Sequence, residues 1–550
     1  MLRISNGRVY DPANTLQSDV RDIYIDGGKI IAAESVSQDQ ARQVETIDAS
    51  GCAVMPGGVD IHTHIAGAKV NTGRIMCPED HYDHVRSTTA ITRAGSGRSS
   101  PTTFMTGYLY SHLGYTTVFE AAVPPLEARH AHEELADIPL VDKGCYAVMG
   151  NNYMVMKTLS DPDQVGRQEK LRDLVSWLLR ASKAYAVKVV NPGGVESWKW
   201  NAGPTDLDTK VAPFGVSSRE IITGLAAAAD ELRLPHPMHL HCNHLGEPGN
   251  VAITIETMRA LEGRRTHFTH LQYHSYAKTP KGGFASGALE IAEYLNQHPE
   301  FTCDVGQIAF GPTLTMTSDA PMEFKLHQLQ HKKWGNCDIE MECGSGLVPV
   351  HYRPSSLVNS IQWSVGLELM LLINDPWQIF LTTDHPNAGP FTTYPLLIRL
   401  LMDVDYRRSW LAQLHPKAKE MTCLADINRA YTLDEIAVIT RAGQAKALGL
   451  AAKGHLGSGA DADIAVYPVK ENKASMFANP RYVFKDGKMV LRDGEICENL
   501  YGKTFCVSPE GPQNLSEDLA EIFRQGYTVE LSNYTVQDEY LPQQEVVPCG

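Results

Sequence analysis

Val59-Asp60-Ile61-His62-Thr63-His64 is an apolar, partly β-branched run that ends in two histidines one residue apart. It follows Pro56-Gly57-Gly58, a strong turn signal, so the run has the features of a strand that starts after a turn. Because alternate side chains of a strand share one face, His62 and His64 point the same way and can hold one metal ion. For an isolated pair, a half-buried strand with two incidental histidines would explain the pattern equally well. The other motifs of the chain distinguish between these two explanations.

Seven more apolar runs of strand length follow, and they alternate with helical stretches. Together with 59–64, the candidate strands are 116–121, 145–149, 184–190, 238–241, 268–271, 301–305 and 378–382. Eight such units predict an α/β fold, a (β/α)₈ TIM barrel, whose chemistry lies at the carboxyl ends of the strands. The capping box that begins at Thr432 predicts a helix that closes the barrel.

Both ends of the chain are rich in short strands and tight turns. Residues 2–9, 22–25 and 29–32 show this pattern first, and residues 461–467, 482–484 and 489–491 repeat it. Neither segment is large enough to bury a core alone, so we expect the two to form one composite β-sandwich domain. The predicted organisation is 1–55 and 451–500 for the two parts of the sandwich, 56–450 for the barrel, and 501–550 for a C-terminal extension.

Composition narrows the class of protein. The chain has 550 residues, 43% of them hydrophobic and 21% charged, which is typical of a globular protein. Its net charge of -15 argues against nucleic acid as a main partner. No apolar stretch has membrane-spanning length, and the eleven cysteines include no Cys-x-x-Cys pair. These features predict a cytoplasmic protein with reduced thiols, no iron–sulfur cluster and no membrane contact.

Two long excursions interrupt the barrel pattern, at 66–115 and 308–375. Structureless loops of this length are uncommon in a compact domain, so each is expected to be a lid, a substrate wall or a subunit contact. The first carries Arg74, Arg86 and Arg93, which are candidates for an acidic ligand or simply solvated arginines. After residue 502, an amphipathic helix around 516–524 and a polar tail would either wrap a partner or fray.

Lys188 lies in an apolar run that ends at Pro192-Gly193-Gly194. Burial disfavours a lysine cation, whereas the carbamate that CO₂ forms with a neutral amine has two oxygens able to bridge two metals. The alternative is a lysine that reaches the barrel rim.

The fifth and sixth runs end in clusters of histidines. His241 and His270 close apolar runs at positions comparable with His64, so they are the predicted ligands. His239, His267, His244 and His274 are more often core residues or groups that orient a ligand. Asp384 ends the eighth run and can bind a metal and accept a proton, although a capping aspartate is the simpler explanation of that residue alone.

The order His-x-His, Lys, His, His, Asp along the barrel resembles that of the amidohydrolases with a carboxylated lysine, such as dihydroorotase, dihydropyrimidinase and urease. The resemblance spans roughly residues 1–495. A closer likeness lies in the segments 60–67, 189–194, 241–246, 268–276 and 383–391. These resemble the A subunit of formylmethanofuran dehydrogenase and, still more, the alpha subunit of the formyltransferase/hydrolase complex of methylotrophic bacteria.

This resemblance implies hydrolysis of N-formylmethanofuran, or of a bacterial methanofuran analogue, to formate and the free amine. It implies two divalent metals, zinc being expected for nitrogen ligands. His62, His64 and Asp384 would hold one metal, His241 and His270 the other, with carboxylated Lys188 between them. Asp384 would be the catalytic base. The neighbouring polar residues predicted to bind substrate or carry protons are Asn191, Asn243, His244, His274 and His385.

Three alternatives stay open at this point. A cyclic-amide hydrolase of dihydropyrimidinase type would share the metals, and the formate-condensing subunit of a formylmethanofuran dehydrogenase would share nearly the whole sequence pattern. A non-catalytic assembly subunit is the third, although the filled ligand set argues against it. The excursions and tail favour a subunit that works with other subunits of such a complex and with a methanofuran-type coenzyme.

Overall fold

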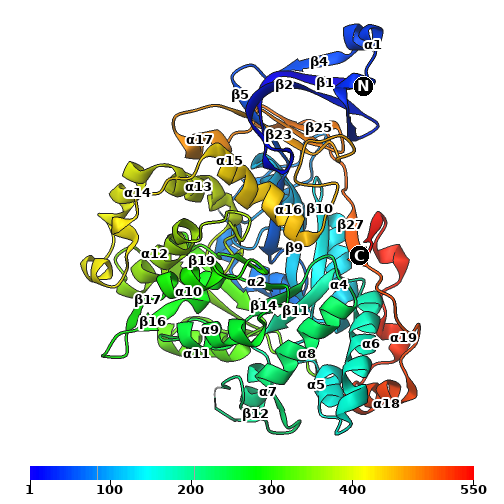
Figure 1. Ribbon diagram of the computed structural model, residues 1–550, viewed down its shortest axis with the longest axis vertical. Coiled ribbons are helices and arrows are strands. Elements are labelled where there is room, and N and C mark those ends of the chain that lie inside the picture. The colour runs from blue at the N-terminus through cyan, green and yellow to red at the C-terminus, as the bar shows by residue number, and fades with distance from the viewer. Residues whose placement is uncertain (83, 204) are drawn as a thin grey trace.

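A computed structural model describes residues 1–82, 84–203 and 205–550 of the chain. Its centre is a curled parallel sheet of eight strands, in agreement with the predicted (β/α)₈ barrel (Figure 1). All eight predicted strands are present, in the predicted order and each paired with the next. They are β6 (Gly58–Thr63), β9 (Tyr115–Val123), β10 (Asp142–Val148), β11 (Ala186–Val190), β14 (Met238–His241), β15 (Thr266–Phe268), β18 (Phe301–Asp304) and β22 (Ile379–Phe380).

Helices of the intervening segments surround this sheet (Figure 1). They are α3 (Thr103–His112), α4 (Ala128–Asp137), α5 (Tyr153–Leu159), α6 (Gln164–Ser182), α7 (Gly194–Lys199), α8 (Ser218–Glu231), α9 (Val251–Ala260), α10 (Ala288–Leu295), α12 (Leu357–Leu372), α13 (Tyr394–Met402) and α14 (Val404–Leu411). The strands are buried on both faces, as parallel strands covered by helices require. No helix within the described ranges is long and apolar enough to cross a membrane.

The seam between the first and last strands is closed by a helix, as the capping box predicts. Thr432 accepts a hydrogen bond from the Glu435 N–H at the start of α15 (Leu433–Ala437). In the following α16 (Gly443–Leu448), the Gln444 side chain accepts from the Ile61 N–H at 2.8 Å and donates to the Leu381 carbonyl at 3.3 Å. One side-chain amide thus joins two strand edges whose backbone groups would otherwise be unpaired.

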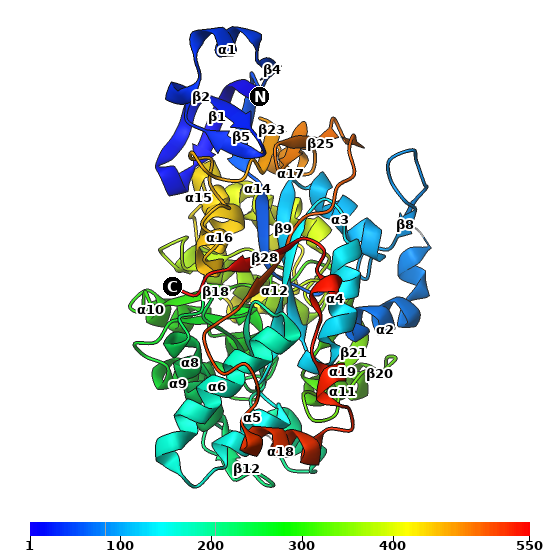
Figure 2. The same ribbon diagram turned by 90° about the vertical axis from the view of Figure 1, so that its right-hand side faces the viewer.

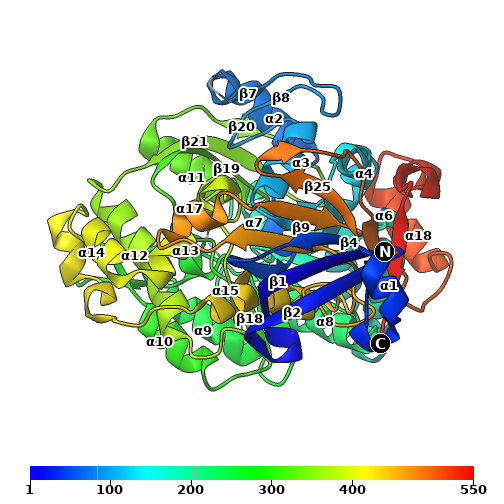
Figure 3. The ribbon, with the colours of Figure 1, turned by 90° about the horizontal axis from the view of Figure 1, so that it is seen from above.

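The two ends of the chain form one β domain, as expected. The N-terminal strands are β1 (Leu2–Asp11), β2 (Leu16–Asp26), β3 (Lys29–Ile31), β4 (Glu45–Asp48) and β5 (Cys52–Pro56), and the C-terminal strands are β23 (Ile464–Pro468), β24 (Tyr482–Lys485), β25 (Lys488–Arg492) and β26 (Glu495–Ile496). Hydrogen bonds between β5 and β23 join them into one nine-stranded sheet, in which blue and orange strands lie side by side (Figure 3). The short helices α1 (Gln38–Gln43) and α17 (Lys473–Phe477) accompany it. The exact domain boundaries stay predictions.

The C-terminal extension packs on the barrel of its own chain, so the second of its two predicted alternatives, a fraying tail, is wrong, and contact with a partner stays a prediction. Its strands β27 (Thr504–Val507) and β28 (Gln544–Val547) pair with each other, and β27 also pairs with the start of β10. The amphipathic helix is present as α18 (Glu517–Gly526), followed by α19 (Leu531–Tyr534). In Figure 2 this red segment runs along the side of the barrel. The buried Glu342 carboxylate accepts from the Tyr527 hydroxyl at 3.0 Å and the Tyr534 hydroxyl at 2.6 Å, which ties the extension to the second excursion.

Both excursions are folded. The first contains α2 (Ala68–Met76), β7 (Val85–Arg86) and β8 (Gly95–Ser96), and its Arg74 pairs with Glu134 at 2.6 Å rather than facing solvent alone. The second contains β19 (Gly311–Thr317), α11 (Ala320–Gln330), β20 (Gly335–Asn336) and β21 (Gly346–Tyr352). The hairpin pair β12 (Lys210–Val211) and β13 (Val216–Ser217), and the pair β16 (Tyr276–Lys278) and β17 (Phe284–Ser286), lie in other loops. The second excursion reaches the carboxyl ends of the barrel strands, where it forms a wall of the candidate site.

Candidate metal centre

His62, His64 and Asp384 meet at the carboxyl end of the barrel. His62 lies in β6 and His64 directly follows that strand, while Asp384 follows β22; an isolated bridge between Thr63 and His385 brings the two strand ends together. Asp384 Oδ1 lies 2.9 Å from His62 Nε2 and 3.4 Å from His64 Nε2. One ligand atom from each of the three residues falls within 4.8 Å of the others, and all three side chains are buried. The structure thus brings together the first predicted ligand group.

His241, His270 and His274 form a second group with the same property. The ring of His241 lies 4.7 Å from that of His270 and 5.1 Å from that of His274. The sequence predicted His274 as a core, ligand-orienting or substrate-binding residue, and not as a metal ligand. A 3-10 turn, Leu271–His274, bends the chain after β15 and returns His274 to the same place as His270. The rings of His62 and His270 are 5.3 Å apart, so the two groups adjoin.

Lys188 projects from β11 into the same region. Its side chain is 1% exposed, and burial lowers the pKa of the amine to about 7, against the opposing influence of the Asp304 and Asp384 carboxylates. Near neutral pH, a lysine with this pKa is neutral about half of the time, and the neutral amine is the form that reacts with CO₂. Strand β11 pairs with β14, with Lys188 opposite His239 and Val190 opposite His241, so Lys188 lies beside the strand that carries a ligand of the second group.

Several buried polar atoms here have no hydrogen-bond partner within the described part of the chain. They are Lys188 Nζ, Asp384 Oδ1, His270 Nδ1 and both ring nitrogens of His274. Leaving such groups unpaired is costly, and a site with so many of them is built for something that pairs with them. Imidazole nitrogens with a carboxylate oxygen are the donor set that zinc and similar divalent ions take, so the residues fit a metal centre.

The backbone is also strained at this end of the barrel. Asn191, His244, His270 and Asp384 have φ values of +39°, +59°, +35° and +45°, in the left-handed region that favours glycine. Such conformations persist only where the surrounding structure requires them, and they cluster at functional sites. The strain coincides with the residues predicted to bind metal or substrate.

Three carboxylates that the sequence analysis did not assign support the histidines. Glu120 on β9 lies 3.0 Å from His64 Nδ1 and accepts the Ala66 N–H at 3.0 Å. Asp319, at the start of α11, lies 3.2 Å from His241 Nε2. Asp304 on β18 accepts from the backbone N–H of His270 at 3.0 Å, which fixes the backbone at that residue. Partners of the ring nitrogens, as at His64 and His241, orient ligand rings and fix which nitrogen carries the proton.

The predicted substrate residues divide into two kinds. Asn191 donates to Asp319 at 2.9 Å, and Asn243 donates to Asn191 at 2.9 Å, so these two form the inner end of a polar chain. His385 is buried, and burial lowers its pKa to about 3. His244 lies farther out, 3.0 Å from Glu247, whose carboxylate raises the pKa of the imidazole.

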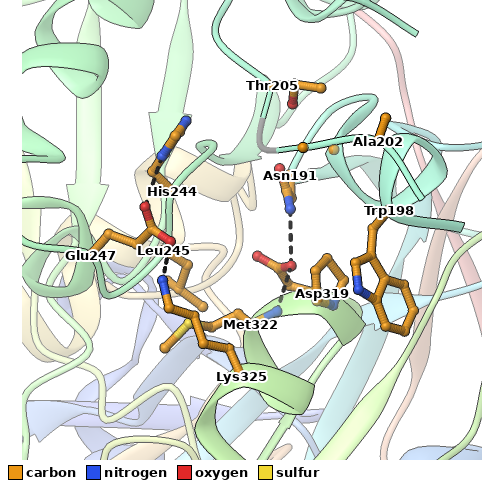
Figure 4. A pocket seen from close by; sticks show the side chains of 13 residues that line it. Asn191, Trp198, Ala202, Thr205, His244, Leu245, Glu247, Asp319, Met322 and Lys325 are labelled. Atoms are coloured by element: carbon orange, nitrogen blue, oxygen red, sulfur yellow. Dashed lines mark hydrogen bonds and ion pairs between the residues drawn. The ribbon is translucent and has the colours of Figure 1, made fainter. Parts of the chain in front are cut away.

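A groove of about 210 Å³ leads to this chain of residues from outside (Figure 4). Asn191 and Asp319 lie at its inner end, and Trp198, Met322 and Leu245 provide apolar lining. On one side, Lys325 Nζ lies 2.5 Å from Glu247 Oε1 (Figure 4). The groove therefore offers an aromatic and apolar wall with a few charged groups, next to a histidine of the candidate centre.

Comparison with known proteins agrees with this geometry. Residues 45–496 match the model of the amidohydrolase family. The chain is 46% identical over 567 aligned residues to protein FwdA of Methanocaldococcus jannaschii, covering 99% of this chain and 98% of that one. It is 39% identical over 549 residues to the A subunit of the formyltransferase/hydrolase complex Fhc of Methylorubrum extorquens, with the same coverage.

A solved structure resembles the whole chain. The crystal structure of the formyltransferase/hydrolase complex FhcABCD from Methylorubrum extorquens, in complex with methylofuran, contains a chain that superposes with a TM-score of 0.93 at 38% identity, over 100% of both chains. The identity to FwdA exceeds that to the Fhc protein, so the full-length comparison does not support the prediction that the Fhc protein is the more similar of the two. Fold, family model and full-length relatives agree, and this chain belongs to the amidohydrolase family.

Proposed function

We propose that this chain hydrolyses the formyl C–N bond of N-formylmethanofuran, or of a methanofuran analogue, to formate and the free amine. The observation that carries the proposal is the convergence of His62, His64 and Asp384 with the histidine trio and Lys188 at one buried place. The relatives supply the substrate class, because the solved complex that resembles this chain over its full length holds methylofuran.

The proposed centre holds two divalent ions, with zinc as the expected metal. His62, His64 and Asp384 would hold one, and His241 and His270 the other, while carboxylated Lys188 would lie between them. His274 belongs to the second group by distance and is an additional ligand candidate. When bound, such ions acidify water from a pKa of about 16 towards 7 and polarise a carbonyl oxygen.

Asp384 is the proposed general base. Asn387 donates to its Oδ2 at 2.9 Å, which leaves Oδ1 as the oxygen that faces the imidazoles. In the proposed reaction, a water oxygen attacks the formyl carbon while Asp384 takes a proton from that water. Asp384 then gives the proton to the amide nitrogen as the C–N bond breaks, so the amine leaves neutral; the formyl group leaves as formic acid, which loses its remaining proton to solvent and becomes formate.

The groove would receive the rest of the coenzyme. A substrate that spans the groove places its formyl end near Asp319 and His241, while Trp198 and Met322 contact its body. Lys325 is half-exposed at the outer side and would interact with a carboxylate on the coenzyme tail. Binding energy from this remote part would position the amide for attack.

A second candidate uses the same site in reverse. The 46% identity to FwdA favours condensation of formate with the amine, as the sequence resemblance to formylmethanofuran dehydrogenase implies. A catalyst accelerates both directions equally, so the direction in the cell would depend on partner subunits. We accordingly propose that the chain works in a hetero-oligomer, as its full-length structural relative does in FhcABCD.

The test is formate release by the purified, zinc-loaded chain. Turnover of N-formylmethanofuran should far exceed that of hydantoin, a cyclic amide, and Asp384→Asn should reduce kcat by a hundredfold or more while keeping much of the metal. Asp405→Asn is the matched control, since the Asp405 side chain is 95% exposed and remote from the groove lining. Near-normal formyl hydrolysis by the Asp384 variant would reject its role, and preferred turnover of hydantoin would reject the substrate class.

A further inference from the structure

Three histidine side chains form a row joined by hydrogen bonds, which we name the histidine file and which runs from the candidate metal centre into the barrel interior. His62 Nδ1 lies 2.8 Å from His239 Nε2, and His239 Nδ1 lies 3.0 Å from His236 Nε2. The file ends where His236 Nδ1 lies 2.7 Å from the carbonyl oxygen of Ala447 in α16. The three side chains are at most 1% exposed. The file thus joins the helix that closes the barrel to a predicted metal ligand.

The carbonyl at the end of the file determines the direction of every bond in it. A carbonyl oxygen only accepts, so His236 Nδ1 must carry a proton and donate it. A neutral imidazole has one N–H, which leaves His236 Nε2 as an acceptor and requires the proton of His239 on Nδ1. By the same step, His239 Nε2 accepts and His62 Nδ1 donates. The remaining nitrogen, His62 Nε2, then carries a lone pair.

That lone pair faces the candidate centre. His62 Nε2 is the atom 2.9 Å from Asp384 Oδ1. The neutral state that the argument needs is favoured by burial, which lowers the pKa of each of the three rings well below its usual value. Two further groups beside His62 Nδ1 are able to accept its proton: the Thr269 hydroxyl, in a short contact, and Asp304 Oδ2 at 3.6 Å.

The two histidines of the His-x-His pair are therefore oriented by hydrogen-bond partners of different kinds. His64 Nδ1 has the Glu120 carboxylate as its partner at 3.0 Å, an arrangement common for metal-binding histidines. His62 Nδ1 has a neutral ring as its 2.8 Å partner, and that ring depends on another. We propose that His236 and His239 are positioning residues that hold His62 in the tautomer whose Nε2 lone pair points into the metal centre. The inference rests on the proposed centre and is independent of the substrate.

Neutron diffraction from perdeuterated, metal-depleted crystals tests the proton positions directly. Deuterons are expected on Nδ1 of His236, His239 and His62, with none on His62 Nε2. A deuteron on His62 Nε2 would overturn the proposal whatever the enzyme's activity. Anomalous scattering from zinc-loaded crystals adds a second outcome: a zinc ion bound among His62, His239 and Asp304, which lie close enough to hold one, would also overturn it.

Variants of His239 test the consequence for metal affinity. His239→Gln keeps an oxygen that accepts from His62 and an amide N–H that donates to His236, whereas His239→Leu keeps neither. Zinc affinity, measured by competition with a chelator, should fall 10- to 100-fold in the Leu variant and stay within a few-fold of the parent in the Gln variant. His132→Leu is the control: His132 is equally buried, but it bonds to the Ser182 carbonyl away from the centre, so its loss should leave zinc affinity unchanged.

The comparison separates hydrogen-bond direction from packing. An equal loss of zinc affinity in both His239 variants would mean that the shape of the ring matters and that the direction of the hydrogen bonds does not. Unchanged zinc affinity in both variants would mean that His239 does not act on His62. Either result would overturn the proposal. If the Leu variant does not fold, the Gln variant and the deuteron positions still decide. Loss of formyl hydrolysis with normal zinc affinity would count against the proposed function and leave this inference intact.

Discussion

The candidate metal centre and a second buried cluster of polar groups, both within the described residues, differ in their bonding. At the candidate metal centre, Lys188 and His274 keep nitrogens with no hydrogen-bond partner in the described residues. The second cluster, which we name the lysine–aspartate cluster, consists of Lys453, Lys485, Asp142, Asp461 and Asp463 where the barrel meets the β domain. There, Lys453 Nζ lies 2.8 Å from Asp461 and 2.7 Å from Asp463, and Lys485 Nζ lies 3.2 Å from both Asp142 and Asp463.

The difference indicates which cluster is for ligands and which is for the fold. In the lysine–aspartate cluster, opposite charges compensate one another, which holds the pKa of Asp142 below and that of Lys453 above its usual value. At the centre, burial dominates, and the pKa of Lys188 falls. Perturbed groups without protein partners mark functional sites, whereas complete ion-pair networks perturb pKa values for structural reasons.

Removing Lys188 should have the largest effect. We expect Lys188→Ala to lose most bound metal and to reduce turnover on the order of a thousandfold, because hydrolysis loses its activated water. Metal analysis and formate release measure both. Propionate, or another short carboxylic acid with two free oxygens, should restore part of each. Lys143→Ala is the control, since Lys143 is also buried but donates to the Gly502 carbonyl, outside the centre. Unaided retention of metal and activity by Lys188→Ala would remove this lysine from the centre.

Breaking the lysine–aspartate cluster should reduce stability and leave metal binding alone. Lys453→Met leaves buried carboxylates unpaired and should lower the free energy of unfolding by about 3–5 kcal/mol. Denaturant titration measures this change, and metal per folded chain should match the parent. Lys488→Met removes an ion pair to Glu498 whose lysine is 60% exposed, so it should cost about 0–1 kcal/mol. Equal effects of the two changes would contradict the structural role.

Glu342 extends the comparison to one carboxyl group that has several partners. Burial raises its pKa from 4.5 to about 7. The folded state therefore holds the proton more tightly than the unfolded state, so Glu342 favours folding fully below about pH 4.5, and this contribution is lost as the pH rises to about 7. The shift corresponds to about 3 kcal/mol. Comparison of unfolding free energies with those of Glu342→Gln across this range checks it, and a difference that does not change with pH would refute it.

The groove should show the smallest effect. Lys325 is 51% exposed and already paired with Glu247, so Lys325→Ala should raise KM a few-fold with kcat unchanged. Steady-state kinetics with the intact coenzyme separates the two parameters. Lys332→Ala, an exposed lysine outside the groove lining, should change neither. A fall in kcat with KM unchanged would place Lys325 outside substrate binding.

Much of this arrangement follows from the sequence. Each barrel strand is an apolar run bounded by turn residues, and parallel strands carry the residues at their ends to one rim. This explains why the sequence could predict the grouping of His62 and His64 with Asp384 and of His241 with His270. Glu120 and Asp304 had a signal that was overlooked: each is an acidic residue within a buried strand, a position that requires a partner.

Other contacts had no local signal. Asp319 reaches His241 from an excursion whose course depends on tertiary packing. His274 returns through a 3-10 turn that the two-residue period of a strand does not predict. The pairing of His236, His239 and His62 depends on strand register across the barrel, and the tail at Thr504–Val507 finds its place only because β10 has a free edge there.

The hydrogen bonds between β5 and β23 have a consequence for synthesis on the ribosome. β5 ends at Pro56 and β23 begins at Ile464, so the 407 residues between them are translated before the edge of β5 that pairs with β23 has its partner. At about 5–20 residues per second, the nascent N-terminal strands wait roughly 20 to 80 s. During that interval an apolar strand edge is open to wrong pairing, and we expect chaperones to guard it until translation is nearly complete.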